Sequence, residues 1–194
     1  MSVVPLVRHE AKFWVHPSLL PALRQAIRPF CHPDRFTAGD PPIYQVTTLQ
    51  LDTRNLSCFR AKDDNALARF KLRCRTYDLV GAPVSLEIKR KLGPNVVKSR
   101  ALIAAGDFGP DLLRGHRVEL SNPDDRPAFD EFLRLVEVIG AQPVVAIRYR
   151  REAWQAVRET YARVTFDTRL AYRPVHHWRL PGPQERWQAI DLAQ

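Results

Sequence analysis

The feature that most constrains the fold is a run of cations at every second position in residues 69–77, RFKLRCRTY. Apolar residues fill the positions between them, which is the period of a β-strand with one apolar face and one cationic face. The four cations are Arg69, Lys71, Arg73 and Arg75. Like charges about 7 Å apart along one face repel each other, so such a face is costly unless an anion lies against it. The strand therefore predicts an anionic partner.

The excess positive charge is concentrated in the same part of the chain. The formal net charge is +9, and residues 69–100 hold nine Lys or Arg against two Asp or Glu. A field concentrated in this way attracts polyanions such as nucleic acid, anionic lipid, nucleotide or polyphosphate. A solvated basic surface that only keeps the protein soluble is the alternative, and the two-residue period argues against it.

Length and composition predict one domain over residues 1–194, with a core that needs no disulfides. The three cysteines share no metal-ligand spacing with the histidines, so we expect small buried residues or free thiols of a reducing compartment. No apolar run approaches the ~18 residues that a membrane span requires, and the N-terminus lacks a signal-peptide profile. These observations predict a soluble, cytoplasmic protein.

Strand patterns dominate the rest of the chain. We expect strands at 7–15, 44–53, 69–77, 84–91, 143–154 and 162–170. We expect helices at 18–30 and 126–140, and a short one near 99–105. Strands on both sides of the helical segments predict an α+β fold with a mainly antiparallel sheet.

The charged faces of these strands predict how the sheet is arranged. An open sheet would leave them exposed to water, where such strict order across several strands has little purpose. Closing the sheet into a β-barrel, with the charges inside and flanking helices over the apolar faces, would explain the order. The interior would then strengthen each contact between a cation and a phosphate. The few inward carboxylates would suit a hard divalent metal.

The order of these segments resembles the VTC domain, the polyphosphate-polymerase module of the vacuolar transporter chaperone and of standalone bacterial proteins. The resemblance runs from about residue 7 to residue 173. Its motifs are R-x-E-x-K at 8–12, R-x-K-x-R-x-R at 69–75, E-x-K-x-K at 87–91 and R-x-T-x-D at 163–167. The family belongs to the triphosphate tunnel metalloenzymes, or CYTH-like superfamily. This implies a tunnel of antiparallel strands, in which basic side chains hold a triphosphate and a divalent metal assists.

The resemblance also implies roles for individual residues. The expected catalytic residues are Lys71, Arg73, Arg75, Lys89 and Arg148. The expected substrate-binding residues are Arg8, Lys12, Lys91, Lys98, Arg150 and Arg163. The expected ligands of Mn²⁺ or Mg²⁺ are Glu10, Glu87 and Asp167.

One departure from the family pattern concerns the C-terminus. Family members typically continue to a last strand of the form L-E-x-K, whose glutamate binds the metal. This sequence stops at ERWQAIDLAQ, and Glu185 lies in a proline-flanked segment. We therefore expect a C-terminally truncated tunnel domain or one that lacks a wall.

The implied reaction is transfer of the ATP γ-phosphate to a growing inorganic polyphosphate chain. An inorganic or nucleoside triphosphatase and an adenylyl cyclase are alternatives on the same fold, but they usually start with E-x-E-x-K, and Arg8 replaces the first glutamate here. A non-catalytic module that binds polyphosphate, triphosphate or single-stranded nucleic acid is a third alternative. Phe13, Phe70 and Phe166 lie on faces opposite the cations, so bases would have little to stack on and we expect no nucleic-acid partner.

Overall fold

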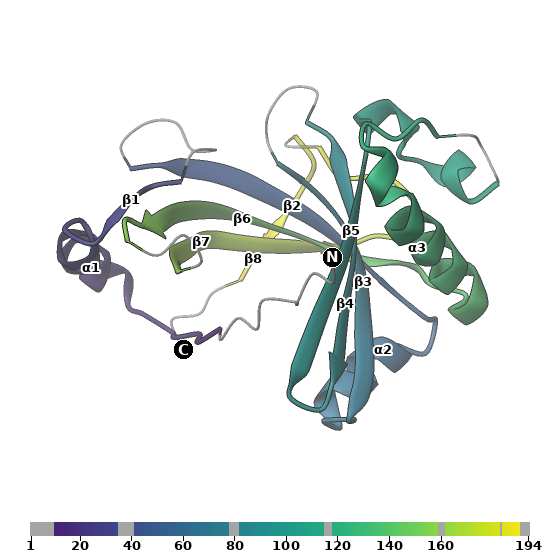
Figure 1. Cartoon of the computed structure of the whole chain (residues 1–194), viewed down its shortest axis with the longest axis horizontal. Coiled ribbons are helices and arrows are strands. Elements are labelled where there is room, and N and C mark those ends of the chain that lie inside the picture. The colour runs from purple at the N-terminus through teal and green to yellow at the C-terminus, as the bar shows by residue number, and fades with distance from the viewer. Residues whose placement is uncertain are drawn as a thin grey trace.

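The computed structural model describes residues 10–34, 41–77, 82–114, 118–158, 162–182 and 184–190. Over these ranges the chain forms an eight-stranded antiparallel sheet with helices beside it (Figure 1). The strands are β1 (Cys31–Pro33), β2 (Ile43–Asp52), β3 (Ala68–Tyr77), β4 (Val84–Leu92), β5 (Asn95–Ile103), β6 (Gln142–Ala156), β7 (Arg163–Pro174) and β8 (Gln188–Ala189). The expected α+β class with antiparallel pairing is confirmed.

The sheet is open in the part of the chain that the structure describes. Its strand order is β5-β4-β3-β2-β6-β7-β8, and β1 pairs with β6. In Figure 1, β3, β4 and β5 run downward from the centre, whereas β2, β6 and β7 run to the left, so the sheet is strongly bent. Since β5 and β8 end the strand order without pairing to each other, the described strands do not form the closed barrel that the charge pattern predicted.

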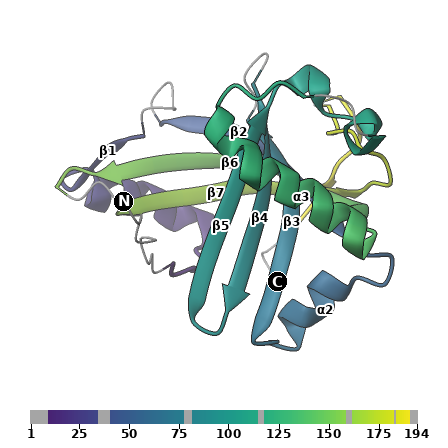
Figure 2. The ribbon, with the colours of Figure 1, turned by 45° about the vertical axis from the view of Figure 1, so that its right-hand side comes forward.

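Helix α3 (Arg126–Ile139) covers the apolar face of β3, β4 and β5, and Figure 2 shows it crossing these strands. Phe129, Phe132 and Val136 recur at helical spacing and are buried against leucines and isoleucines of the sheet, including Leu86 and Ile88. The helices are α1 (Leu20–Ile27), α2 (Ser57–Asp63) and α3 (Arg126–Ile139). The 3₁₀ turns are η1 (Pro17–Leu19), η2 (Ala105–Asp107), η3 (Pro110–Arg114) and η4 (Pro123–Asp125). The apolar face is thus covered by a helix, as expected.

Two local predictions were wrong. Residues 10–15 of the expected strand at 7–15 have no regular structure, and residues 7–9 lie outside the described residues. The short helix expected near 99–105 is strand β5 followed by η2, because β5 pairs along the whole length of β4. Helix α2 was not predicted.

Among the described residues, no helix has both the length and the apolar character that crossing a membrane requires.

Candidate functional site

Three lysines form a row across the face of the sheet that is opposite α3. Lys71 of β3 is the direct partner of Lys89 of β4, and Lys89 is the direct partner of Lys98 of β5. Directly paired residues of an antiparallel sheet share a face, with their Cβ atoms about 5 Å apart. Like charges at this distance repel, so this row is a strong attractor for an anion.

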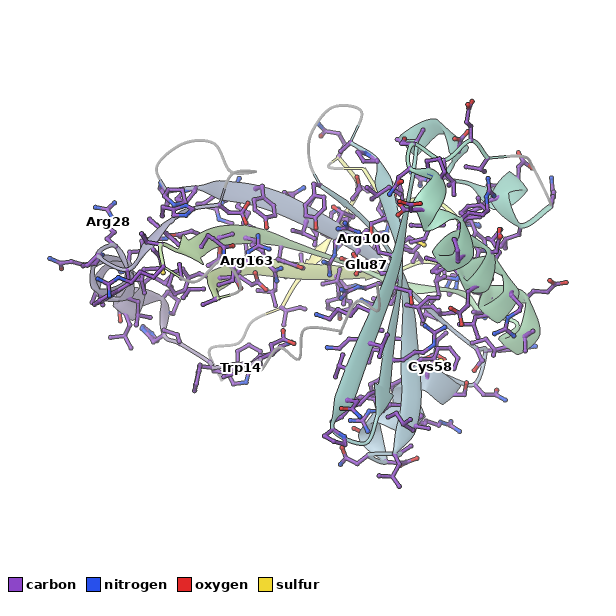
Figure 3. All side chains as sticks on the ribbon, in the orientation of Figure 1. Trp14, Arg28, Cys58, Glu87, Arg100 and Arg163 are labelled. Carbon is purple, nitrogen blue, oxygen red and sulfur yellow. The ribbon has the colours of Figure 1, made fainter. Side chains whose placement is uncertain are left out.

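A second row lies next to the lysines and contains an acid between two arginines. Arg73, Glu87 and Arg100 are direct partners across β3, β4 and β5. The Nε atom of Arg73 donates a 2.6 Å hydrogen bond to Glu87, and the Nη1 atom of Arg75 lies 3.6 Å from the same carboxylate. Figure 3 labels Glu87 and Arg100 close together where the two parts of the bent sheet meet. Glu87 therefore orients Arg73 and Arg75, and the row Arg73–Glu87–Arg100 keeps a net positive charge.

The segment before α1 adds one acid and one base to this face. The carboxylate of Glu10 lies 3.5 Å from the amine of Lys12 and 3.7 Å from that of Lys89. Burial opposes ionisation of Glu10, but Lys12, Lys89 and Lys98 outweigh it and lower the pKa of this carboxyl. Both Glu10 and Lys12 therefore lie beside the lysine row.

Two lysines of the row have a lowered pKa, which means that their charged form is disfavoured in the folded protein. Burial lowers the pKa of Lys71, and the nearby charges of Lys62, Lys89 and Lys12 lower it further. Burial also lowers the pKa of Lys89; Glu10 opposes this effect, whereas Lys98 and Lys12 add to it. An anion on this face would offset both effects, since a nearby opposite charge raises the pKa of an ammonium group.

Arg151 of β6 belongs to the same face, and the sequence analysis did not identify it. Arg151 is the direct partner of Tyr44 on β2, and Thr48, four residues further along that strand, is the partner of Arg75. Since side chains alternate along a strand, Arg151 and Arg75 lie on one face of the sheet. Arg151 makes two 2.7 Å hydrogen bonds to Asp167 of β7, so its guanidinium is oriented.

We call this surface the cationic face. Its members are Arg69, Lys71, Arg73, Arg75, Glu87, Lys89, Lys91, Lys98, Arg100, Arg151, Arg163 and Asp167, with Glu10 and Lys12 beside it. Lys91 is the direct partner of Arg69. Arg163, labelled on β7 in Figure 3, forms an ion pair with the buried Asp34. Arg8 was also predicted here but lies outside the described residues.

Arg148 and Arg150 do not lie on the cationic face, and this prediction was wrong. Arg148 is the direct partner of Thr47, and Arg150 is the direct partner of Gln45. Both positions of β2 alternate with Thr48, so their side chains belong to the opposite face. There the guanidinium of Arg148 lies over the ring of Trp187, 4.4 Å from its centroid.

The three predicted metal ligands are not gathered into one site. Four strand steps separate β4 from β7, and the register places Glu87 level with Pro174 of β7, seven residues from Asp167. Each carboxylate is already paired with arginine or lysine. Among the described residues no group of three His, Cys, Asp or Glu could hold a metal ion. The side chains that the structure describes therefore do not by themselves form a preformed metal centre.

The fold and this face define an α+β domain whose antiparallel sheet carries ordered rows of cations on one face. A family model described as the VTC domain matches residues 7–193, so the chain belongs to the VTC domain family. The resemblance that the motifs indicated is confirmed. This family is associated with polyphosphate synthesis, which indicates a polyphosphate-related function. A comparison with curated proteins found no match.

Proposed function

We propose that this domain is a polyphosphate polymerase, which transfers the γ-phosphate of ATP to the end of an inorganic polyphosphate chain on the cationic face. The observation that carries the proposal is the row Lys71–Lys89–Lys98. Three lysines in register on one sheet face are costly when alone and favourable when phosphates lie along them. A polyphosphate chain provides that repeated negative charge.

The arginines and lysines of the face would have different tasks. A guanidinium binds two phosphate oxygens at once in a fixed geometry, whereas an ammonium acts as a mobile point charge. Arg73 is oriented by Glu87, and Arg151 by Asp167. We therefore assign the positioning of the reacting phosphates to these arginines. We assign the neutralisation of the chain to Lys71, Lys89 and Lys98.

The transfer needs little covalent help from the protein. A terminal oxygen of the polyphosphate chain would attack the γ-phosphorus, and the bond from that phosphorus to the β,γ-bridging oxygen would break. ADP would leave with the electron pair, and the chain would grow by one phosphate. The attacking oxygen is largely ionised near neutral pH, so no general base is required. Positioning and charge neutralisation would supply the rate acceleration.

A divalent ion would reach the face with the phosphates. Mg²⁺ at such sites is bound through one or two carboxylates and the substrate phosphates rather than by an all-protein cage. Glu10 and Glu87 fit this arrangement, because Glu10 contacts Lys89 and Glu87 lies two residues from Lys89 on the same face. Bound Mn²⁺ or Mg²⁺ would neutralise part of the phosphate charge.

We propose also that residues 1–194 form one tunnel domain, with the cationic face lining its interior.

Binding without turnover is a second candidate function. The observation that favours it is that Glu87 and Asp167 are both paired with arginines, so a metal ion would have to compete with these arginines for either carboxylate. In this case the domain would hold polyphosphate or triphosphate and would not transfer phosphate.

The test is incubation of the protein with ATP and Mn²⁺, followed by gel separation of long phosphate chains. The proposal predicts chains that lengthen with time, and none from the Arg73→Ala/Arg75→Ala variant. In a parallel incubation with tripolyphosphate, release of orthophosphate without chain growth would show that the protein is a triphosphatase and not a polymerase. If the protein binds tripolyphosphate tightly but forms neither long chains nor orthophosphate, the second candidate function, binding without turnover, would be supported.

A further inference from the structure

A cluster of exposed apolar side chains lies at the end of the arm that β3, β4 and β5 form. In Figures 1 and 2 these three strands run together away from the rest of the sheet, and the β4–β5 hairpin lies at their far end. We call this end the arm tip and define it by Leu67, Leu92, Gly93, Pro94 and Val96. Leu67, Leu92 and Val96 have 78%, 67% and 42% of their surface exposed. Single exposed apolar residues are ordinary, but a cluster at a protruding end is typical of an interaction site.

Strand pairing brings these residues together. Leu92 is the direct partner of Ala68, the residue after Leu67. Val96, on the other strand of the hairpin, is the direct partner of the residue before Leu92. The backbone N–H of Gly93 donates a 2.9 Å hydrogen bond to the carbonyl of Leu67. The exposed side chains therefore surround one turn, although they come from different parts of the chain.

The backbone of this turn has few donors left to bond with water. The N–H of Gly93 is bonded to Leu67, and Pro94 has no N–H. Asn95 belongs to the strand ladder as the direct partner of Leu92. Gly93 has a φ of 55°, which glycine adopts without strain. Because an unpaired polar group is costly outside water, such a turn enters an apolar layer at a lower cost than an open loop would.

Cations surround the arm tip. Lys91 precedes Leu92 and is the direct partner of Arg69 across β3 and β4. Residues 59–69 and 91–98 together hold five Lys or Arg against two Asp, so cations exceed acids by three. The cations are Arg60, Lys62, Arg69, Lys91 and Lys98, and the acids are Asp63 and Asp64 at the end of α2. The arm tip is therefore apolar at its end and positively charged around it.

This arrangement matches the layers of an anionic bilayer. A strand rises about 3.3 Å per residue, so Lys91 and Arg69 stand within about 7 Å of the leucines along the arm. The polar layer of one leaflet is about 5–8 Å deep, which is half the difference between the full and the hydrocarbon thickness. With Leu67 and Leu92 at the edge of the hydrocarbon, these two cations would lie at the level of the lipid phosphates.

We propose that the arm tip binds the surface of anionic bilayers, with Leu67 and Leu92 between the headgroups and the acyl chains and with Lys91 and Arg69 against lipid phosphates. Peripheral binding of this kind combines burial of apolar area with attraction of cations to anionic lipids. The complementary charge is the reason to choose an anionic surface over a neutral one. The inference does not rest on the proposed polymerase activity.

The test is sedimentation of the protein with vesicles of phosphatidylcholine alone and of phosphatidylcholine mixed with phosphatidylserine. We expect saturable binding to the mixed vesicles and much weaker binding to the neutral ones. Leu67→Ser/Leu92→Ser keeps every charge and should weaken binding to the mixed vesicles by about tenfold or more, because two apolar side chains no longer leave water. Its thermal unfolding should match that of the parent, since both side chains are already exposed.

Arg73→Ala/Arg75→Ala leaves the arm tip unchanged and should still bind the mixed vesicles. This variant separates the arm tip from the cationic face, to which Arg69 and Lys91 also belong.

Leu113→Ser/Val138→Ser is the matched control, because both side chains are exposed but lie in η3 and α3. It should bind the mixed vesicles as the parent does. The proposal is overturned if the parent does not bind these vesicles, or binds the neutral ones equally well. It is also overturned if Leu67→Ser/Leu92→Ser binds like the parent, or if Arg73→Ala/Arg75→Ala abolishes binding, because the cationic face and not the arm tip would then hold the lipid.

Discussion

Lys71 and Lys89 face each other directly across β3 and β4, and Lys89 faces Lys98 in turn across β4 and β5. Within this row of the sheet no acid separates the three charges. Glu10, which reaches Lys89 at 3.7 Å, comes from the segment before α1. The arrangement costs folding free energy in the absence of an anion, and this cost is the origin of the first two predictions.

Replacing one lysine of the row should stabilise the empty protein and weaken its binding of phosphate chains. Like charges directly opposite each other on a sheet typically cost about 0.2–1 kcal/mol. We therefore expect Lys89→Met to raise the free energy of unfolding by an amount in this range, measured by urea denaturation at low salt. The same variant should bind tripolyphosphate less tightly. A variant that is less stable than the parent and binds tripolyphosphate equally well would contradict this prediction.

The same lysines predict a rise of stability with pH. Because burial and neighbouring cations lower the pKa of Lys71 and Lys89 in the folded protein, the unfolded chain holds these protons to higher pH. The unfolded state then binds more protons between the lowered pKa and the unfolded value of about 10.4, so stability rises with pH there. The measurement is the free energy of unfolding of the parent and of Lys71→Met/Lys89→Met at several pH values across this range, and the difference between the two proteins is the quantity that should change. A difference that does not change with pH would contradict the explanation.

Arg150 and Arg151 are neighbours in the chain that lie on opposite faces of the sheet, so they form a matched pair. We expect Arg151→Gln to weaken tripolyphosphate binding by about tenfold or more, since it removes a guanidinium from the cationic face. Arg150→Gln removes the same charge from the other face and should change the affinity little. Calorimetric titration of both variants checks this prediction. Equal losses of affinity would mean that only net charge matters and not the face.

Asp52 at the end of β2 explains how α2 is held to the sheet. Its carboxylate accepts hydrogen bonds of 2.9 Å from the backbone N–H groups of both Cys58 and Phe59, and its side chain is buried. Asp52→Ala should lower the free energy of unfolding by about 1–3 kcal/mol, because it leaves these buried donors without an acceptor. Thermal or urea denaturation checks this value. A loss well below this range would show that water replaces the carboxylate.

The sequence predicted β3 and β4 well because each has one face that is almost uniformly apolar. In β6 the pattern was ambiguous. One face carries Ile147, Tyr149 and Arg151, and the other carries Arg148 and Arg150, so both faces contain charge. The choice between the two faces depends on pairing with β2, which a single strand does not encode. The expectation that Arg148 and Arg150 act together with the cations of β3 and β4 placed them on the wrong face, and Arg151 was missed.

Other parts of the structure depend on contacts that the periodicity of one element does not reveal. Helix α2 receives no cap from its preceding residue Leu56, which has a φ of 56°; its first backbone N–H groups donate instead to the side chains of Thr53 and Asp52. Its cap is Asp52, which belongs to a strand. The carboxylates Glu87 and Asp167 had the right chemistry for a metal, but their pairing with arginines depends on the register of strands.

The central claim is that the cationic face binds phosphate chains, and titration of tripolyphosphate into Arg73→Ala/Arg75→Ala tests it most directly. The account predicts a folded variant whose affinity falls by more than about 100-fold, since two charge-assisted phosphate contacts are lost. The control is Arg114→Ala/Arg134→Ala, which removes the same charge from exposed positions in η3 and α3. This control should bind tripolyphosphate as the parent does. Parent-like affinity in Arg73→Ala/Arg75→Ala would contradict the account.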